Sequence, residues 1–100
     1  MSVNEISVQE LAALKDAVVV DVREPDEYAS GHVPAATNMP LGDVRERSAE
    51  LGGAGTVYVV CQSGRRSALA CEALESLGLA AVNVTGGTTA WIAADLPVEQ

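Results

Sequence analysis

The chain contains almost no aromatic residues, one histidine and only two cysteines. Phenylalanine is absent and aromatic residues make up 3% of the 100 residues, so the core must be built from Val, Leu, Ile and Ala. Two cysteines, Cys61 and Cys71, are too few for a disulfide framework, and no cluster of metal-ligating residues accompanies them. We therefore expect free thiols in a reducing compartment, the cytoplasm.

The sequence also lacks long apolar runs and an excess of basic residues. Its apolar runs are far too short to cross a membrane, and residues 1–5 have neither the basic nor the apolar region of a signal peptide. With 14 acidic against 6 basic residues, the formal net charge is −8. Since phosphate backbones are bound by basic faces, nucleic acid is not expected as a partner, and neither is a membrane.

Apolar runs rich in β-branched residues alternate with helical patterns along the chain. We expect strands at residues 18–22, 36–39, 57–60 and 81–84, and helices at residues 8–15, 25–30, 41–51, 66–77 and 88–93. This alternation predicts an α/β sandwich around a mostly parallel sheet. A hydrophobic content of 48% over 100 residues fits one domain that spans residues 1–100.

Cys61 stands between an apolar strand and a helix, close to the turn residue Gly64. The backbone N–H groups of such a turn and the positive end of the helix dipole favour a thiolate and hold an anion beside it. The charges of Arg65 and Arg66 act in the same direction. Ligands of parallel sheets bind at the carboxyl ends of strands, where Asp21 also falls. The pattern predicts that Cys61 is a nucleophile.

Three separated motifs resemble the signatures of the rhodanese family. They are Asp21-Val22-Arg23-Glu24 with Glu27-Tyr28 and Gly31-His32-Val33-Pro34-Ala35-Ala36, the loop Cys61-Gln62-Ser63-Gly64-Arg65-Arg66-Ser67, and Gly86-Gly87 with Ala90-Trp91 and Leu96-Pro97-Val98. The resemblance covers nearly the whole chain and indicates a single-domain rhodanese of the thiosulfate sulfurtransferase family. It implies a three-layer α/β sandwich, with a five-stranded, mostly parallel sheet and helices on both faces.

Rhodaneses are sulfurtransferases, and the resemblance implies the same chemistry here. Cys61 would attack the outer sulfur of a donor such as thiosulfate or glutathione persulfide and become a persulfide. Cyanide, a thiol or a protein acceptor would then remove that sulfur. The N–H groups of the loop would stabilise negative charge on the terminal sulfur. No metal or organic cofactor is implied.

The resemblance assigns six residues to a substrate-binding and anion-binding loop, namely Gln62, Ser63, Gly64, Arg65, Arg66 and Ser67. We expect Gln62 and Ser63 to line the site with backbone N–H groups while their side chains face outward. Gly64 is expected to adopt a backbone conformation barred to other residues. Arg66 is expected to support the loop and bind an anion, and Arg65 to tune the choice of donor.

Other residues near the motifs have simpler roles. Ser67 is expected to cap the following helix, and Asp21 and Arg23 to support the loop through an ion pair or hydrogen bonds. His32 is expected to be structural, since a thiolate already ionised by its loop needs no base. Cys71 lies within a helix at a position for a small packing residue, so we expect it in the core, with a disulfide to Cys61 as the minor alternative.

Two other functions stay open. One is a sulfur carrier or partner-docking module with little turnover of its own. The other is a phosphatase or arsenate reductase, because such enzymes resemble rhodaneses in fold. They have five residues between the cysteine and the arginine, whereas Cys61 and Arg66 are separated by four, the shorter ring expected for a sulfur-sized anion. The sequence leaves the physiological donor and acceptor and the oligomeric state undetermined.

Overall fold

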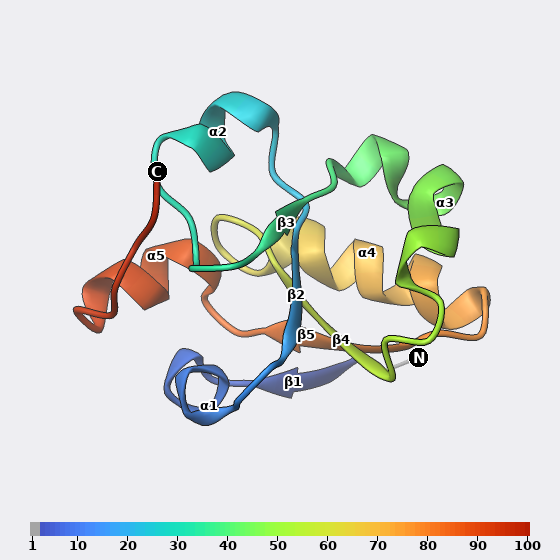
Figure 1. Cartoon of the computed structure of the whole chain (residues 1–100), viewed down its shortest axis with the longest axis horizontal. Helices are drawn as coiled ribbons and strands as arrows, with labels where there is room; N and C mark the ends of the chain where they lie inside the picture. Colours follow the sequence, from blue (N-terminus) through green and yellow to red (C-terminus); the bar gives the residue numbers. More distant parts are fainter. Residues whose placement is uncertain (1–2) are drawn as a thin grey trace.

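A five-stranded parallel sheet forms the centre of the fold (Figure 1). The computed structural model describes residues 3–100, and residues 1 and 2 lie outside the described part of the chain. The strands are β1 (Asn4–Ile6), β2 (Val18–Asp21), β3 (Thr37–Asn38), β4 (Thr56–Val60) and β5 (Ala80–Val84). Their order is β1-β5-β4-β2-β3, and every neighbouring pair is parallel, which confirms the predicted α/β sheet.

Helices cover both faces of the sheet, as expected (Figure 1). They are α1 (Val8–Ala13), α2 (Pro25–Ala29), α3 (Val44–Arg47), α4 (Arg65–Ser76) and α5 (Gly87–Ala93), with short 3-10 turns η1 (Leu41–Asp43) and η2 (Ser48–Leu51). Residues of α3 and α4 share one core cluster, and residues of α1 and α5 share the other. None of the helices described in residues 3–100 is long and apolar enough to cross a membrane.

The central strand β4 places Cys61 on the side of α4. Successive side chains of a strand point to opposite faces, so Val57, Val59 and Cys61 join the cluster under α4 while Val60 joins the cluster under α1 and α5. Both faces of β4 are buried, which explains its continuous apolar sequence. The nucleophile candidate therefore lies at the carboxyl end of a buried strand, as the sequence predicted.

Two elements differ from the sequence-based expectation. Strand β1 was not expected, because Asn4 and Glu5 are exposed at the sheet edge and the strand has no apolar run. The helix expected over residues 41–51 is broken into η1, α3 and η2. Only Val44 and Leu51 are buried in this stretch, too few to form the apolar stripe that would hold one continuous helix against the sheet.

Helix α5 is anchored to the segment after β4 through a very close approach of backbones. The N–H groups of Thr88 and Thr89 donate to the carbonyl oxygens of Cys61 and Gln62 at 2.8 and 3.0 Å. Gly87 permits this approach, because a Cβ atom there would lie 2.3 Å from the Cys61 oxygen. Its φ of +57° also lies in the left-handed region. The glycine thus fixes the position of α5 against the candidate site.

Substitution of Gly87 by alanine tests this close approach against a matched control. Gly55 also has a left-handed φ, +76°, but a Cβ atom there meets nothing within 4 Å. We expect Gly55→Ala to lower the free energy of unfolding by about 1 kcal/mol. Gly87→Ala should cost roughly 2 kcal/mol more, because the backbone of the loop must move as well. Urea unfolding measures both losses, and equal losses would contradict the proposed packing.

Candidate active site

Cys61 follows β4 directly and precedes a three-residue turn that leads into α4. Its side chain is almost fully buried, at 1% exposure. The Gly64 N–H donates to Cys61 Sγ at 3.1 Å, and the Ser67 hydroxyl lies 3.3 Å from the same sulfur. The structure therefore surrounds the sulfur with hydrogen-bond donors from the turn and the first turn of α4. The strand-turn-helix pattern predicted the backbone donor but not the Ser67 hydroxyl.

These donors lower the pKa of the Cys61 thiol. Burial by itself raises this pKa, because the charged form loses solvation. Hydrogen bonds from the Ser67 hydroxyl and from the backbone N–H groups of Ser67, Gly64 and Ser63 act in the opposite direction and outweigh burial. The pKa of Cys61 consequently lies below its ordinary value, as a nucleophilic thiolate requires.

Gly64 has the special conformation that was expected of it. Its φ is +103°, in the left-handed region, and a Cβ atom there would lie 3.3 Å from the Gly86 nitrogen. This conformation ends the turn and directs the Gly64 N–H at Cys61 Sγ. The Gly64 carbonyl accepts a hydrogen bond from the Asn83 side chain at 3.0 Å, so the turn is also held by β5.

The two arginines of the loop lie in different environments. Arg65 is exposed at the first position of α4. Arg66 donates from both terminal nitrogens to the two carboxylate oxygens of Glu27 in α2, at 2.8 and 2.9 Å. The cation at this helix start is thus compensated by a carboxylate of the protein itself. Hydrogen bonding to Glu27 raises the pKa of Arg66 and lowers the pKa of Glu27 to about 2.

Two expectations for loop side chains were wrong. Ser67 was expected to cap α4, but the cap residue is Gly64, and Ser67 is fully buried with its hydroxyl directed at Cys61 and Asn83. Gln62 was expected to face outward. Its amide instead accepts a hydrogen bond from Arg23 at 3.2 Å and donates one to Thr89. Ser67 turns inward, where its buried hydroxyl finds hydrogen-bond partners, whereas Gln62 is half-buried and links Arg23 to the exposed Thr89. Ser63 is exposed, as expected.

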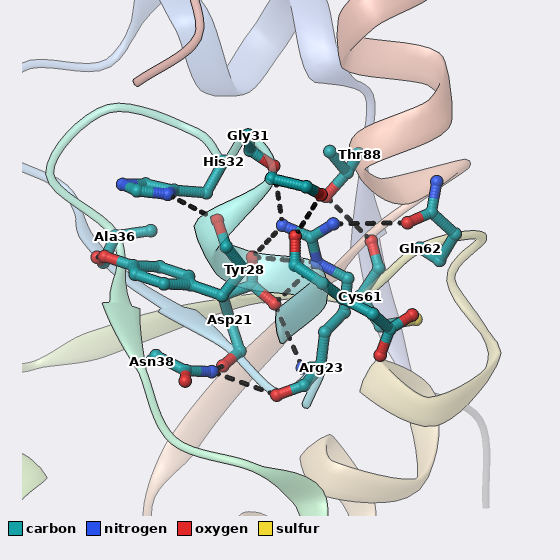
Figure 2. Close-up of polar contacts among 12 residues, drawn as sticks. Asp21, Arg23, Tyr28, Gly31, His32, Ala36, Asn38, Cys61, Gln62 and Thr88 are labelled. Carbon is teal, nitrogen blue, oxygen red and sulfur yellow. Dashed lines mark hydrogen bonds and ion pairs between the residues drawn. The ribbon is translucent and has the colours of Figure 1, made fainter. Parts of the chain in front are cut away.

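Asp21 and Arg23 form a buried ion pair beside the loop (Figure 2). Arg23 Nε and Nη2 donate to the two carboxylate oxygens of Asp21 at 3.0 and 2.8 Å. The side chains are 0% and 2% exposed. Arg23 also donates to the Gly31 carbonyl and to Gln62 Oε1. The pair thus connects the end of β2 to the loop after β4, and the ion pair expected from the sequence is present.

His32 and Cys71 have contacts that fit structural roles. The His32 ring stacks on Tyr28 with ring centroids 3.7 Å apart, and its Nδ1 lies 2.8 Å from the Tyr28 carbonyl oxygen. Its backbone pairs with Glu99, so the carboxyl-terminal segment runs alongside the stretch after α2 (Figure 1). Cys71 is fully buried, and burial raises its pKa to about 12. Both cysteines are free.

The structure also brings residues to the site that the sequence analysis did not assign. Asn83 contacts Ser67 and Gly64, Glu27 pairs with Arg66, and Thr88 donates to the Cys61 carbonyl. The signal for Asn83 was present, since a polar residue inside an otherwise apolar strand must find a hydrogen-bond partner. Within residues 3–100, no group of three or more His, Cys, Asp or Glu side chains could hold a metal ion.

A sizeable apolar cavity lies away from this site. It has a volume of about 490 Å³. Its lining includes Leu11 of α1, Trp91 of α5, and Val33 from the segment between α2 and β3. None of the residues from Cys61 to Ser67 lines it. The candidate site is therefore defined by the hydrogen-bond donors around Cys61 and not by this cavity.

The chain and its fold match one protein family. The family model described as Rhodanese-like domain matches residues 7–94. A "Sulfurtransferase" of Allochromatium vinosum is 38% identical over 101 residues, 96% of this chain and 94% of that protein. The structure of a rhodanese-related protein from Thermoplasma volcanium has 37% identity and a TM-score of 0.90, over 96% of this chain and 97% of that one. The chain belongs to the rhodanese-like domain family.

One further relative is longer than this chain. The "Putative sulfur carrier protein YrkF" of Bacillus subtilis (strain 168) is 36% identical over 95 residues, which are 90% of this chain. The chain spans about half of its length, 51%. Of these two relatives, one is named for sulfur transfer and the other for sulfur carriage.

Removal of the Arg23 charge tests how far the site depends on the buried pair. We expect Arg23→Met to lower the free energy of unfolding by about 3–5 kcal/mol, because the buried Asp21 side chain loses its ion-pair partner. The control is Arg47→Met, which breaks the exposed pair with Glu50 and should cost about 1 kcal/mol or less. Urea unfolding of both variants gives the comparison. Similar losses in the two variants would show that the buried ion pair contributes no more to the free energy of unfolding than the exposed one.

The Glu27–Arg66 pair predicts a pH dependence of stability. A carboxylate whose pKa falls on folding stabilises the native state above its unfolded pKa, and this contribution is lost as pH falls through the folded pKa. For Glu27 the window runs from its ordinary value of about 4.3 down to about 2. The stability difference between wild type and Glu27→Gln should therefore be constant above about pH 5 and shrink towards pH 2.

Unfolding by urea across this pH range measures the difference, and Arg66→Met supplies the control. In the Arg66→Met background the pairing partner is gone, so the pH-dependent effect of Glu27→Gln should shrink to the part that the hydrogen bond from the Glu24 N–H contributes. A pH dependence of undiminished size in this background would show that Arg66 is not its cause.

Proposed function

We propose that this chain moves sulfane sulfur through a persulfide at Cys61. The observation that supports the proposal best is the cluster of donors around Cys61 Sγ, where the Gly64 N–H and the Ser67 hydroxyl approach a buried sulfur. Hydrogen bonds to a buried thiolate are stronger than the same bonds in water. Membership of the rhodanese-like domain family supports the same chemistry. We further propose that residues 1–100 act as one rhodanese-like domain.

Sulfur transfer would proceed in two displacements at sulfur. The Cys61 thiolate attacks the outer sulfur of thiosulfate, a new S–S bond forms, and sulfite leaves with the electron pair of the broken bond. Cyanide or a thiol then attacks the outer sulfur of the persulfide, and Cys61 leaves as a thiolate. Atoms and electrons balance over the two steps without any further oxidant or reductant.

The loop would stabilise each form of the sulfur by a different group. The Gly64 N–H and the Ser67 hydroxyl stabilise the thiolate at Sγ. N–H groups of Gln62 and Ser63, in the turn in front of α4, would stabilise charge on the outer sulfur once the persulfide has formed. Asp21 and Arg23 would act indirectly, by holding Gln62 and with it the loop.

The donor is thiosulfate or a persulfide such as glutathione persulfide. Because Arg66 is already paired with Glu27, the exposed Arg65 is left to attract the anionic part of the donor. The acceptor is a thiol, a protein, or cyanide in an assay. We propose a cytoplasmic location, since a reducing compartment keeps both cysteines as the free thiols that the structure shows.

A sulfur carrier that delivers its persulfide to a partner protein is the second candidate. The similarity to a protein named as a sulfur carrier favours it. The exposed side chain of Leu69 favours it too, because this residue lies on α4 one turn after Arg65, where a partner could bind beside the loop. A carrier would hold a persulfide for long periods and release it slowly to small acceptors.

Intact mass under non-reducing conditions tests the persulfide. Wild type treated with thiosulfate or glutathione persulfide should gain the mass of one sulfur atom and lose it on addition of cyanide. Cys61→Ser should gain no sulfur. Cys71→Ser is the matched control and should behave as wild type, because Cys71 is buried and has a raised pKa.

Several outcomes would separate the candidates. A sulfur gain with rapid turnover supports a sulfurtransferase, and a sulfur gain with slow release to small acceptors supports a carrier. No gain from either donor, with Cys61 still open to alkylation, would overturn the proposal. Hydrolysis of an aryl phosphate or reduction of arsenate would then identify the phosphatase or arsenate reductase alternative.

A further inference from the structure

The Ser67 hydroxyl faces two acceptors with a single proton. Its oxygen lies 3.3 Å from Cys61 Sγ and 2.5 Å from Asn83 Oδ1. A hydroxyl has one proton to donate, so it can serve only one of these acceptors at a time. Ser67 and Asn83 are 0% and 2% exposed, so bulk water does not supply a second donor to the Asn83 oxygen.

The orientation of the Asn83 amide is fixed by its other partners. Asn83 Nδ2 lies 3.0 Å from the Gly64 carbonyl oxygen and 3.2 Å from Glu5 Oε2 in β1. A carbonyl and a carboxylate accept hydrogen bonds and cannot donate them, so the NH₂ group must face both. The Oδ1 atom is thereby directed at Ser67 and acts as a permanent acceptor there.

We propose that Asn83 is a positioning residue that holds the Ser67 hydroxyl away from Cys61 Sγ and releases it only while that sulfur carries negative charge. The inference rests on the proposed persulfide function and adds a residue to it. In the thiol form, the Cys61 S–H donates to Ser67 Oγ and the hydroxyl donates to Asn83. When the thiol proton leaves to solvent, the hydroxyl rotates and donates to the thiolate.

The same exchange runs in reverse when the persulfide forms. The negative charge moves from Sγ to the outer sulfur, so Sγ no longer attracts the hydroxyl, and Ser67 donates to Asn83 again. No proton is gained or lost by Ser67 or Asn83 in either direction. The hydrogen bond from Ser67 to Asn83 thus stabilises the thiol and the persulfide, in which Sγ is uncharged. The hydrogen bond from Ser67 to Sγ stabilises the thiolate, which forms between these two states.

Charged and titratable groups on the neighbouring elements make their hydrogen bonds and ion pairs with atoms other than the Ser67 hydroxyl. Glu5 of β1 contacts the NH₂ end of Asn83, and Arg66 of α4 is held by Glu27 of α2. Cys71 of α4 is a neutral thiol. On β2, the charge of Arg23 is paired with Asp21. None of these contacts involves the Ser67 hydroxyl, so the competition for its proton is a property of Cys61, Ser67 and Asn83.

A double-mutant cycle on the reactivity of Cys61 tests the inference. The rate of Cys61 alkylation by iodoacetamide is measured against pH in wild type, Ser67→Ala, Asn83→Val and the double variant. At a pH below the pKa of Cys61, Ser67→Ala should slow alkylation by about tenfold, the effect of one lost hydrogen bond to a charged atom. Asn83→Val should speed it several-fold, because the hydroxyl is released from its competing acceptor.

The double variant distinguishes positioning from a merely structural role. If Asn83 acts through the hydroxyl, Asn83→Val has no effect on alkylation in the Ser67→Ala background. If Asn83 acts by holding the Gly64 carbonyl, its substitution changes alkylation equally in both backgrounds, and the inference is overturned. Slower alkylation by Asn83→Val in the wild-type background would overturn it as well. Ser67→Thr keeps a hydroxyl and should restore the wild-type pH profile.

Two further variants keep the test decisive. Glu5→Gln leaves the orientation of the Asn83 amide to the Gly64 carbonyl, so it should change alkylation by less than about twofold. If Asn83→Val does not fold, Asn83→Ala replaces it in the same cycle. Alkylation needs only a thiol, so the cycle can be measured even if Cys61 takes up no sulfur. Failure of this inference and failure of the proposed function therefore give different results.

Discussion

The buried ion pair between Asp21 and Arg23 is the interaction on which the arrangement of the site depends. A charged guanidinium at 2% exposure needs every donor satisfied, and Arg23 meets this need from three separate parts of the chain. Asp21 lies at the end of β2, Gly31 follows α2, and Gln62 belongs to the active-site loop. Because one planar group must be bound by all three, the segments are held in one mutual position.

The loop that this pair supports directs mainly neutral hydrogen-bond donors at Cys61 Sγ. Arg66 is paired with Glu27, so the donors nearest to the sulfur are the Gly64 N–H and the Ser67 hydroxyl. Such neutral donors can stabilise a negative charge on sulfur without a counter-ion of their own. This suits a chain with a net charge of −8, in which an additional free cation would be drawn to the many carboxylates.

Local patterns predicted the strand, the turn and the helix around Cys61, because each depends on residues next to one another in sequence. The apolar run before Cys61 fixes a strand, and Gly64 permits the left-handed turn at φ +103°. Local sequence patterns failed to predict those elements whose formation depends on packing against other parts of the chain. Strand β1 has no apolar signature of its own, and the stretch 41–51 has too few buried residues to stay one helix.

The sequence by itself determined the order of most elements, the family and the place of Cys61 at a strand end, since apolar periodicity and turn residues act over a few positions. Only the tertiary structure decided which partner each polar side chain takes. Arg66 meets Glu27 from 39 residues away, and Ser67 meets Asn83 from 16 residues away. A buried hydrogen bond is made with whatever group folding brings within reach, and no local pattern encodes that neighbour.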